Sequence, residues 1–304
     1  MGVEKKENDL FCQNNPRLIE HHIIDFVISL KEKGLSYSAI HNYVATITAF
    51  YKINDIILNT TKINKFLPEY KKVKKDRAYT HEEIHTLLDI ADERFRAIIL
   101  ILASTGIRIG ALSVLKLKHL QHNKLVIYEN TNEEYVTFIT PECQKAIDLY
   151  IDMRSRYGEK LDPECYLIRE QFDVRAPASF SRPKQTNSAT ISKKLMDLAQ
   201  RAGVRNKEVP IAHGFRKFFT TELVNSKVNP EIREMLLGHK IGLASCYYRP
   251  SVDEMYSEYE KAIDNLTIDP ANRLQRKIET LTIEKSRIDR IEEKMLKMEQ
   301  MYQK

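Results

Sequence analysis

The sequence predicts a mainly α-helical fold with a small β-hairpin or sheet, divided into a small N-terminal domain, a larger second domain and a C-terminal helix. Apolar residues recur three and four positions apart through much of the 304-residue chain, which is the spacing of one helix face. An alternating pattern typical of paired strands is confined to residues 125–139. A basic block at residues 71–77 interrupts the apolar pattern, and a chain of this length favours two domains.

Residues 15–70 are predicted to form the small helical domain. The pair Asn15-Pro16 is typical of a helix N-cap and first helical residue, and Gly34 ends that helix. A second helix is expected over residues 36–54, and a third, shorter segment ends at Pro68. The predicted core positions of the first two helices are Ile19, Ile23, Phe26, Val27, Leu30, Ile40, Val44, Ile47 and Phe50.

A basic linker, residues 71–79, is predicted between the two domains. Its charged positions are Lys71, Lys72, Lys74, Lys75 and Arg77. Such blocks are either solvated tethers or interaction segments, and both interpretations stay open. In the second case the linker lies against a phosphate backbone, where each neutralised phosphate releases counterions.

Residues 80–265 are predicted to form the larger domain. Thr80 and Glu83 fit a capping box that starts a helix. Residues 98–103 are apolar enough for a buried helix, which Gly106 is expected to end. Further helices are expected at residues 141–157, 188–202, 213–226 and 230–238, and a second capping box at Ser251 and Glu254 starts another.

Two irregular regions are predicted within this domain. The strands 125–128 and 135–139 flank the acidic turn 129–134 as a hairpin. Residues 166–187 fit no regular pattern and predict a long loop, and long loops in compact domains are often functional. Its basic residues include Arg175, Arg182 and Lys184.

Residues 270–304 are predicted to form a highly charged amphipathic helix. Its apolar residues have a mainly three-four spacing, but Lys285 occupies one position of the stripe and the step from Ile288 to Ile291 breaks strict heptad phase. A short oligomerising coiled coil and a single helix packed on a neighbouring subunit both fit this pattern. The stripe consists of Leu274, Ile278, Leu281, Ile288, Ile291, Met295 and Met298.

Composition limits the class of protein. The formal charge is +6 and the isoelectric point is about 8.9, which permits a polyanionic partner. No apolar run reaches the roughly 20 residues of a membrane span, and residues 1–14 lack the apolar core of a signal peptide, so a cytoplasmic protein is expected. The four widely separated cysteines indicate neither a zinc site nor a disulfide framework, and we expect no metal and no cofactor.

Five residues form a set suited to breaking and rejoining a phosphodiester. Arg108 and Arg216 are permanently charged groups that could hold the non-bridging oxygens. His213 and His239 could bind the phosphate or move a proton near neutral pH. Tyr248, with neighbouring Tyr247 as the fallback, could act as a nucleophile, because a phosphotyrosine conserves the bond energy needed for religation. Each residue alone is more often structural, so the argument rests on the combination.

The combination resembles the tyrosine recombinase (integrase) family. Arg108 matches the arginine of the Thr-Gly-x-Arg box, His213 and Arg216 match the His-x-x-Arg box, and His239 matches the Leu-Gly-His box. Tyr248 matches the nucleophile by its spacing of nine residues from His239. The similarity extends over residues 15–265, where the first domain resembles the family's core-binding module and the second its catalytic domain, and the wording around Tyr248 looks most like archaeal members.

Two departures from the family pattern affect the expected site. The family usually has a glutamate three residues after its first arginine, and this chain has Ala111. A lysine normally lies in or beside the hairpin turn and protonates the leaving oxygen, but residues 129–134 contain none. Lys124 is the nearest substitute, and Lys184 in the basic loop is the second. An acidic turn facing phosphate would be repulsive, so this turn is expected to face away from DNA or toward a neighbouring subunit.

The resemblance implies a clamp around double-stranded DNA. Tyr248 would form a 3′-phosphotyrosine and release a 5′-hydroxyl that attacks the partner strand. The protein is expected to act as a homo-tetramer on DNA, to be a monomer when free, and to work with accessory DNA-bending proteins. Integration or excision of a mobile element is the expected role. Resolution of chromosome dimers, type IB topoisomerase chemistry and a cleavage-deficient DNA-binding role are the alternatives.

Overall fold

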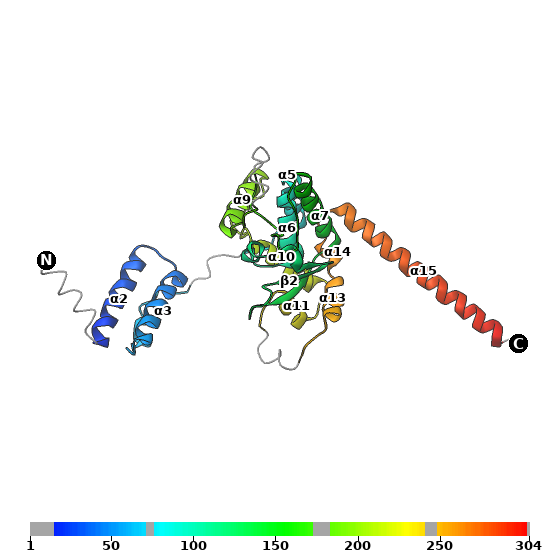
Figure 1. Cartoon of the computed structure of the whole chain (residues 1–304). Coiled ribbons are helices and arrows are strands. Elements are labelled where there is room, and N and C mark those ends of the chain that lie inside the picture. Colours follow the sequence, from blue (N-terminus) through cyan, green and yellow to red (C-terminus); the bar gives the residue numbers. More distant parts are fainter. Residues whose placement is uncertain (1–14, 71–75, 173–182, 241–247, 303–304) are drawn as a thin grey trace. The chain divides into compact units, whose positions relative to one another are not determined.

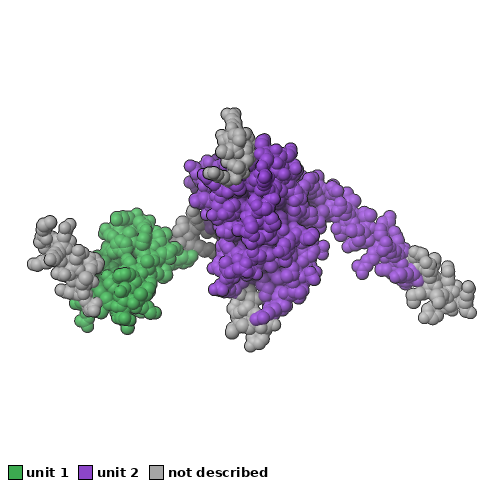
Figure 2. Space-filling view, viewed as in Figure 1, with its two compact units in different colours: residues 1–75 green, residues 76–304 purple. Residues whose placement is uncertain are grey.

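The computed structural model describes residues 15–70, 76–172, 183–240 and 248–302. The chain divides into two compact units, residues 1–75 and residues 76–304 (Figure 2). Each unit has its own hydrophobic core. Helices dominate both units, and the only strands among the described residues form one three-stranded sheet in unit 2 (Figure 1).

Unit 1 is built from two packed helices and one short helix. The side chain of Asn15 caps α2 (Pro16–Glu32) by accepting from the backbone N–H of Arg17, and Ser36 caps α3 (Tyr37–Ile53) in the same way. The short α4 (Thr60–Asn64) packs against α2. The core consists of Ile19, Ile23, Ile24, Val27, Leu30, Ile40, Val44, Leu58 and Ile63.

Two residues predicted to lie in the core of unit 1 are exposed. Phe26 is 38% exposed and Phe50 is 61% exposed, whereas Ile24 is buried. A five-residue α4 cannot enclose the far side of two 17-residue helices, so the apolar surface beyond the core remains open. The two phenylalanines line a groove of about 640 Å³ together with Leu18, Ile19, His22, Ile23, Thr46, Ile47 and Tyr51.

The central helix of unit 2 is α6 (Glu93–Thr105). It follows α5 (His81–Ile90), which begins with a complete capping box formed by Thr80 and Glu83. Residues 97–103 of α6 are all buried, as the apolar run predicted. This helix packs mainly on α7 and α10. The remaining helices are α7 (Pro141–Arg156), α9 (Ser188–Arg201), α10 (His213–Asn225), α11 (Pro230–Leu236), α13 (Val252–Glu260), α14 (Ile263–Leu266) and α15 (Pro270–Tyr302).

The predicted hairpin is part of a three-stranded antiparallel sheet. Strands β2 (Lys124–Ile127) and β3 (Tyr135–Phe138) pair with Ile127 opposite Tyr135 and Lys124 opposite Phe138. A third strand, β1 (Leu120–Gln121), pairs with β2 on its other side. The sequence did not predict this strand, because two residues are too few to show the alternation of apolar and polar side chains that is typical of a strand. Two 3₁₀ helices precede the sheet, η1 (Ile109–Ser113) and η2 (Leu117–His119).

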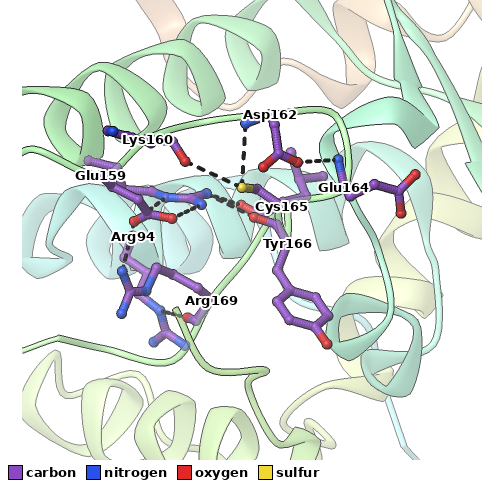
Figure 3. Close-up of polar contacts among 10 residues, drawn as sticks. Arg94, Glu159, Lys160, Asp162, Glu164, Cys165, Tyr166 and Arg169 are labelled. Atoms are coloured by element: carbon purple, nitrogen blue, oxygen red, sulfur yellow. Dashed lines mark hydrogen bonds and ion pairs between the residues drawn. The ribbon is translucent and has the colours of Figure 1, made fainter. Parts of the chain in front are cut away.

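A buried ion network anchors part of the region that was predicted to be a loop. Arg154 and Arg169 both bind the carboxylate of Glu159, at 2.6 and 2.8 Å. Arg94 donates to the carbonyl of Arg169 at 2.8 Å, and Figure 3 labels Arg94, Glu159 and Arg169 of this network. Burial opposes ionisation of Glu159, but hydrogen bonds from the two arginines outweigh it and hold its pKa below the usual value. The network therefore ties residues 159–169 to α6 and α7.

The other side of this region is also held in place. Arg94 donates to the hydroxyl of Thr186 at 3.0 Å, and Gln185 donates to the carbonyl of Ser113 at 2.8 Å. Residues 183–187 thus lie against α6 and η1. The predicted loop residues Arg175, Pro177 and Arg182 fall outside the described residues. None of the described helices is long and apolar enough to cross a membrane.

Candidate active site

The site begins where the end of α6 meets α10. Gly106 ends α6 in the left-handed conformation, with φ at +61°, as the sequence predicted. A side chain at this position would overlap Phe219, because a Cβ atom would lie 2.4 Å from Cδ1 of that ring. The glycine thus lets α10 approach closely. One turn earlier on α10, Nη1 of Arg216 donates to the carbonyl oxygen of Gly106 at 2.7 Å.

Arg216 also holds the segment that follows α11. Its Nη2 donates to the carbonyl oxygen of Leu237 at 2.6 Å and lies 2.8 Å from Nε2 of His239. Only 7% of Arg216 is exposed, so these bonds fix the guanidinium in one position. Residues far apart in the sequence, at the ends of α6 and α11, therefore meet at one guanidinium on α10.

Tyr135 packs beside this guanidinium. Gly238 has φ at +68°, and a Cβ atom there would lie 2.4 Å from Cε1 of Tyr135, so the ring lies directly on the glycine backbone. The guanidinium of Arg216 lies close enough to the phenol for its positive charge to oppose the rise in the pKa of Tyr135. Burial raises the pKa of Tyr135 to about 12. The phenol thus stays protonated at neutral pH, and Tyr135 lines the site as an uncharged side chain.

Glu234 orients His239. The Glu234 carboxylate lies 2.6 Å from Nδ1 of the ring, and this hydrogen bond is the main cause of the lowered pKa of Glu234. A guanidinium can only donate. Nε2 of His239 must therefore accept from Arg216, which places the ring proton on Nδ1, where it is donated to Glu234. A chain Glu234–His239–Arg216 results.

Arg108 is the solvent-exposed arginine of the candidate site. It is the N-cap residue of η1 and is exposed to solvent. Burial lowers the pKa of Arg216, and the like charge of Arg108 lowers it further, so the two guanidiniums are close enough to repel each other. Two neighbouring permanent cations, one exposed and one anchored, form a site for an anion such as phosphate. Ala111, which replaces the expected glutamate, is fully buried and carries no charge toward Arg108.

His213 is the first residue of α10 and precedes Arg216 by one turn. Its surface is exposed, yet partial burial lowers its pKa, and the positive charges of Lys217 and Arg216 lower it further. The imidazole is consequently neutral at pH 7 and is able to accept a proton. The structure therefore places His213 within electrostatic range of Arg216 and leaves the residue exposed at the surface.

Tyr248 binds a carboxylate of the following helix. The phenol of this half-buried residue donates to Oε1 of Glu254 at 3.0 Å. Partial burial raises the pKa of Tyr248, and the hydrogen bond and negative charge of Glu254 raise it further. No interaction between Tyr248 and Arg216 or Arg108 is present among the described residues. Tyr247 lies outside them.

The second predicted capping box is only half formed. The Ser251 hydroxyl accepts from the backbone N–H of Glu254 at 3.1 Å and caps α13. The Glu254 carboxylate, which would complete the box, binds Tyr248 instead. The phenol competes for this carboxylate because it lies three residues before the N-cap, on the same side of the first turn.

The two candidate lysines occupy different parts of unit 2. Lys124 pairs with Phe138 at the end of β2 opposite to Tyr135, which is about 10 Å away along the strand. Lys184 is exposed, and its neighbour Gln185 is bonded to the last residue of η1, the helix that Arg108 begins. No contact of either lysine with Arg108 or Arg216 is present among the described residues, so the choice between the two lysines stays a prediction.

The acidic turn and the linker have partners within unit 2. Glu129 lies 3.5 Å from Nζ of Lys118 and 3.4 Å from Nε2 of His119. Arg77, the one described residue of the basic set in the linker, binds Glu83 at 2.6 Å and is held inside the domain. Lys71, Lys72, Lys74, Lys75 and Arg182 lie outside the described residues. Within the described ranges no cluster of three His, Cys, Asp or Glu side chains could hold a metal.

The comparison with protein families decides the classification. Residues 77–253, more than half of the chain, match the model of the phage integrase family. The chain belongs to this family. The matched range contains all six predicted catalytic positions, Arg108, Lys124, His213, Arg216, His239 and Tyr248.

Other integrase-family proteins resemble this member along much of their length. Tyrosine recombinase XerA of Pyrococcus furiosus is 24% identical over 254 residues, which cover 79% of this chain and 80% of the relative. The structure of the Tn1549 transposon integrase in complex with circular intermediate DNA shares the fold with a TM-score of 0.54 at 22% identity, and covers 79% of this chain and 84% of that one. A lambda integrase dimer bound to a COC′ core site also has a TM-score of 0.54, at 16% identity and 76% and 79% coverage.

Three residues of this integrase-family site were not predicted from the sequence. Tyr135, Glu234 and Glu254 contact Arg216, His239 and Tyr248 respectively. Tyr135 had been assigned only to a strand, and Glu254 only to a helix cap. Glu234 carries a weak sequence signal, since a carboxylate five residues before a histidine that follows a helix-ending glycine can fold back onto the ring.

Proposed function

We propose that the chain is a site-specific recombinase that cuts and rejoins double-stranded DNA through a 3′-phosphotyrosine formed by Tyr248. The observation that carries the proposal is the cluster of Arg108, Arg216 and His239, drawn from three distant segments into one anion-binding site. Membership of the phage integrase family supports it. No metal or nucleotide enters the proposed reaction.

The site residues divide the chemistry among them. The phenol oxygen of Tyr248 attacks the phosphorus, the bond to the 5′ oxygen breaks, and the phenol proton passes to a base. Neutral His213 is suited to accept that proton. Arg108 and Arg216 stabilise the charge that develops on the non-bridging oxygens. Reversal with the 5′-hydroxyl of a partner strand rejoins the DNA without loss of bond energy.

His239 changes partner in this reaction. In the free protein its Nε2 accepts from Arg216 while Nδ1 donates to Glu234. When phosphate binds at Arg216, protonation of Nε2 would let the ring donate to the phosphate, and the Glu234 carboxylate would stabilise the resulting imidazolium. Glu234 is accordingly a positioning residue, since it touches His239 and not the DNA.

Tyr248 has to leave Glu254 before it can attack. Partial burial raises the pKa of Tyr248, and the hydrogen bond to the Glu254 carboxylate raises it further by holding the phenol in its protonated form. Transfer of the ring from Glu254 to the arginine pair removes that stabilisation of the protonated form. We propose that DNA binding drives this transfer, within one subunit or toward the site of a neighbour.

Lys124 is the proposed donor of the proton to the 5′ oxygen, and Lys184 is the second candidate. Lys124 begins β2, opposite Phe138 of β3. The segment of Lys184 is tied through Gln185 to Ser113, the last residue of η1, at the opposite end of that helix from Arg108. Comparing Lys184→Ala with Lys124→Ala on a substrate with a 5′-thio leaving group tests this, because such a leaving group needs no proton and restores only the variant that lacks the acid.

The wider assembly follows from the same proposal. Residues 15–70 would bind DNA as a core-binding module, and residues 80–265 would form the catalytic domain that cuts and rejoins the DNA. Residues 71–79 would link these two domains. Four copies, assisted by DNA-bending proteins, would exchange strands in the cytoplasm at the ends of a mobile element. Resolution of chromosome dimers is the second candidate role, because the same cutting and rejoining chemistry serves both. Sequencing DNA joined to the protein in cells separates them, since one role gives element ends and the other a single chromosomal site.

A nicked suicide substrate tests the central proposal. The wild-type chain should trap a covalent adduct, Tyr248→Phe should form none, and Tyr247→Phe should form a normal amount. Arg216→Ala should lose at least about 100-fold in adduct formation while binding DNA with much smaller loss. Peptide mass mapping locates the modified residue. An adduct that persists without both tyrosines, or cleavage that needs a divalent ion, would overturn the proposal.

A further inference from the structure

The apolar stripe of α15 is exposed in the described part of unit 2. In the described part of unit 2, the hydrogen bonds and ion pairs that tie α15 to the rest of the unit come from its first two turns, through Asn272, Arg273 and Arg276. The helix continues for 33 residues, about 50 Å. Its apolar residues are between 49% and 63% exposed at Leu274, Ile278, Leu281, Ile288, Ile291 and Met295. A continuous exposed stripe of this kind marks an interface.

The stripe has a two-fold pattern centred on Ile288. We define the α15 seam as Leu274, Ile278, Leu281, Lys285, Ile288, Ile291 and Met295. It advances 21 residues from Leu274 to Met295 in six steps, a mean of 3.5, which is the period of a two-stranded coil. The steps alternate between four and three, except that two steps of three meet at Ile288. Leu281 and Met295 are therefore equally distant from Ile288, as are Lys285 and Ile291.

Charge selects the direction of pairing. In a parallel, in-register pair, Lys285 would face the same lysine of its partner at the seam, which is unfavourable. In an antiparallel pair centred on Ile288, Lys285 lies opposite the partner's Ile291 and within one residue of the level of Glu292. The two opposite charges then meet at both symmetry-related positions. Leu281 meets the partner's Met295, and Ile288 meets its own copy.

We propose that α15 pairs with α15 of a second copy of this chain as an antiparallel coiled coil whose two-fold axis passes near Ile288. The phase break at Ile288 is then the point where the pattern reverses. The starts of the two helices would lie about 50 Å apart, given a rise of 1.5 Å per residue. The coil would join two copies without DNA. The inference does not depend on the proposed recombinase function.

Single cysteines introduced into the full chain test the geometry of the coil. The background has Cys12, Cys165 and Cys246 replaced by serine, retains buried Cys143, and must give no cross-linked dimer itself. Ile288→Cys should form a disulfide dimer on mild oxidation, and Leu274→Cys should not, because its two copies would lie about 40 Å apart. A mixture of Leu281→Cys and Met295→Cys chains should cross-link with each other. Efficient Leu274→Cys dimers would show a parallel coil and overturn the proposal.

A charge substitution on each face of α15 gives an independent test by sedimentation of the free protein. Ile288→Lys should weaken dimerisation at least about 100-fold, because two ammonium groups would be buried together at the axis. Ile283→Lys is the matched control, since Ile283 is 70% exposed and lies off the seam. It should change dimerisation less than about three-fold. A wild-type chain that remains a monomer up to its solubility limit, or equal effects of the two variants, would refute the coil.

Discussion

Substitution of Gly106 by alanine tests whether the close approach of α6 and α10 builds the site. Gly106 adopts φ +61°, and a new Cβ would lie 2.4 Å from Cδ1 of Phe219. Phe219 is fully buried and cannot move aside freely. Left-handed backbone costs an alanine about 1–2 kcal/mol, and overpacking of a buried ring adds about 1–3 kcal/mol. We expect Gly106→Ala to lower the free energy of unfolding by about 2–5 kcal/mol.

Gly203→Ala is the matched control for this prediction. Gly203 lies in the same unit with φ +71°, and nothing lies within 4 Å of the Cβ it would gain. It carries the backbone cost without the overlap, and should lose only about 1–2 kcal/mol. Urea unfolding followed by far-ultraviolet circular dichroism measures both changes, and the Gly106 variant should unfold at least about 0.3 M earlier than the control. Equal losses in the two variants would refute the packing argument.

The same substitution has a functional readout. The carbonyl oxygen of Gly106 accepts from Arg216 at 2.7 Å, so displacement of α10 from the end of α6 also displaces that guanidinium. Adduct formation by Gly106→Ala should therefore fall even at temperatures where the variant is fully folded. A folded variant with wild-type adduct formation would show that this anchor of Arg216 is dispensable.

Three further predictions concern single groups. Glu234→Ala should slow adduct formation about ten-fold or more because His239 loses both its orientation and the carboxylate that stabilises its charged form. Glu234→Gln can still accept from Nδ1 but carries no charge, so it should recover only part of the rate, and wild-type rates in both variants would contradict the positioning role. Since Glu254 raises the pKa of Tyr248, Glu254→Gln should lower that pKa and shift the alkaline rise of the adduct-formation rate to lower pH, and an unchanged profile would contradict the contact. Burial raises the pKa of Cys143 to about 12, so iodoacetamide at pH 8 should modify this thiol only after the protein unfolds. Peptide mapping measures the modification, and labelling of Cys143 in the folded protein would contradict its burial.

The helices of unit 2 could be predicted from local sequence because their ends and buried faces are local properties. Thr80 with Glu83, and Gly106, satisfy backbone groups within one turn of the chain. The run 98–103 is apolar on every side, which fits only a buried helix. The partial failure at Ser251 has a tertiary cause. Nothing in the motif reveals that Tyr248 would take the Glu254 carboxylate.

The core of unit 1 shows a different limit. Helical spacing places Phe26 and Phe50 on plausible inner faces, but exposure depends on what covers each face. A five-residue α4 covers too little. The spacing of apolar residues does not show how many other elements are available to cover a helix face. Apolar residues at the edge of that face are therefore the ones wrongly predicted to be buried.

The sequence by itself determined the family and the order of the candidate site residues, because the motifs around Arg108, Arg216 and His239 are short contiguous segments of the chain. Only the tertiary structure decided how they are held. The carbonyls of Gly106 and Leu237 that anchor Arg216 carry no side-chain signal, since every residue has a carbonyl. The direction in which these carbonyls point depends on how α6, α10 and α11 are packed against one another. That packing joins segments far apart in the sequence, so no single segment determines it.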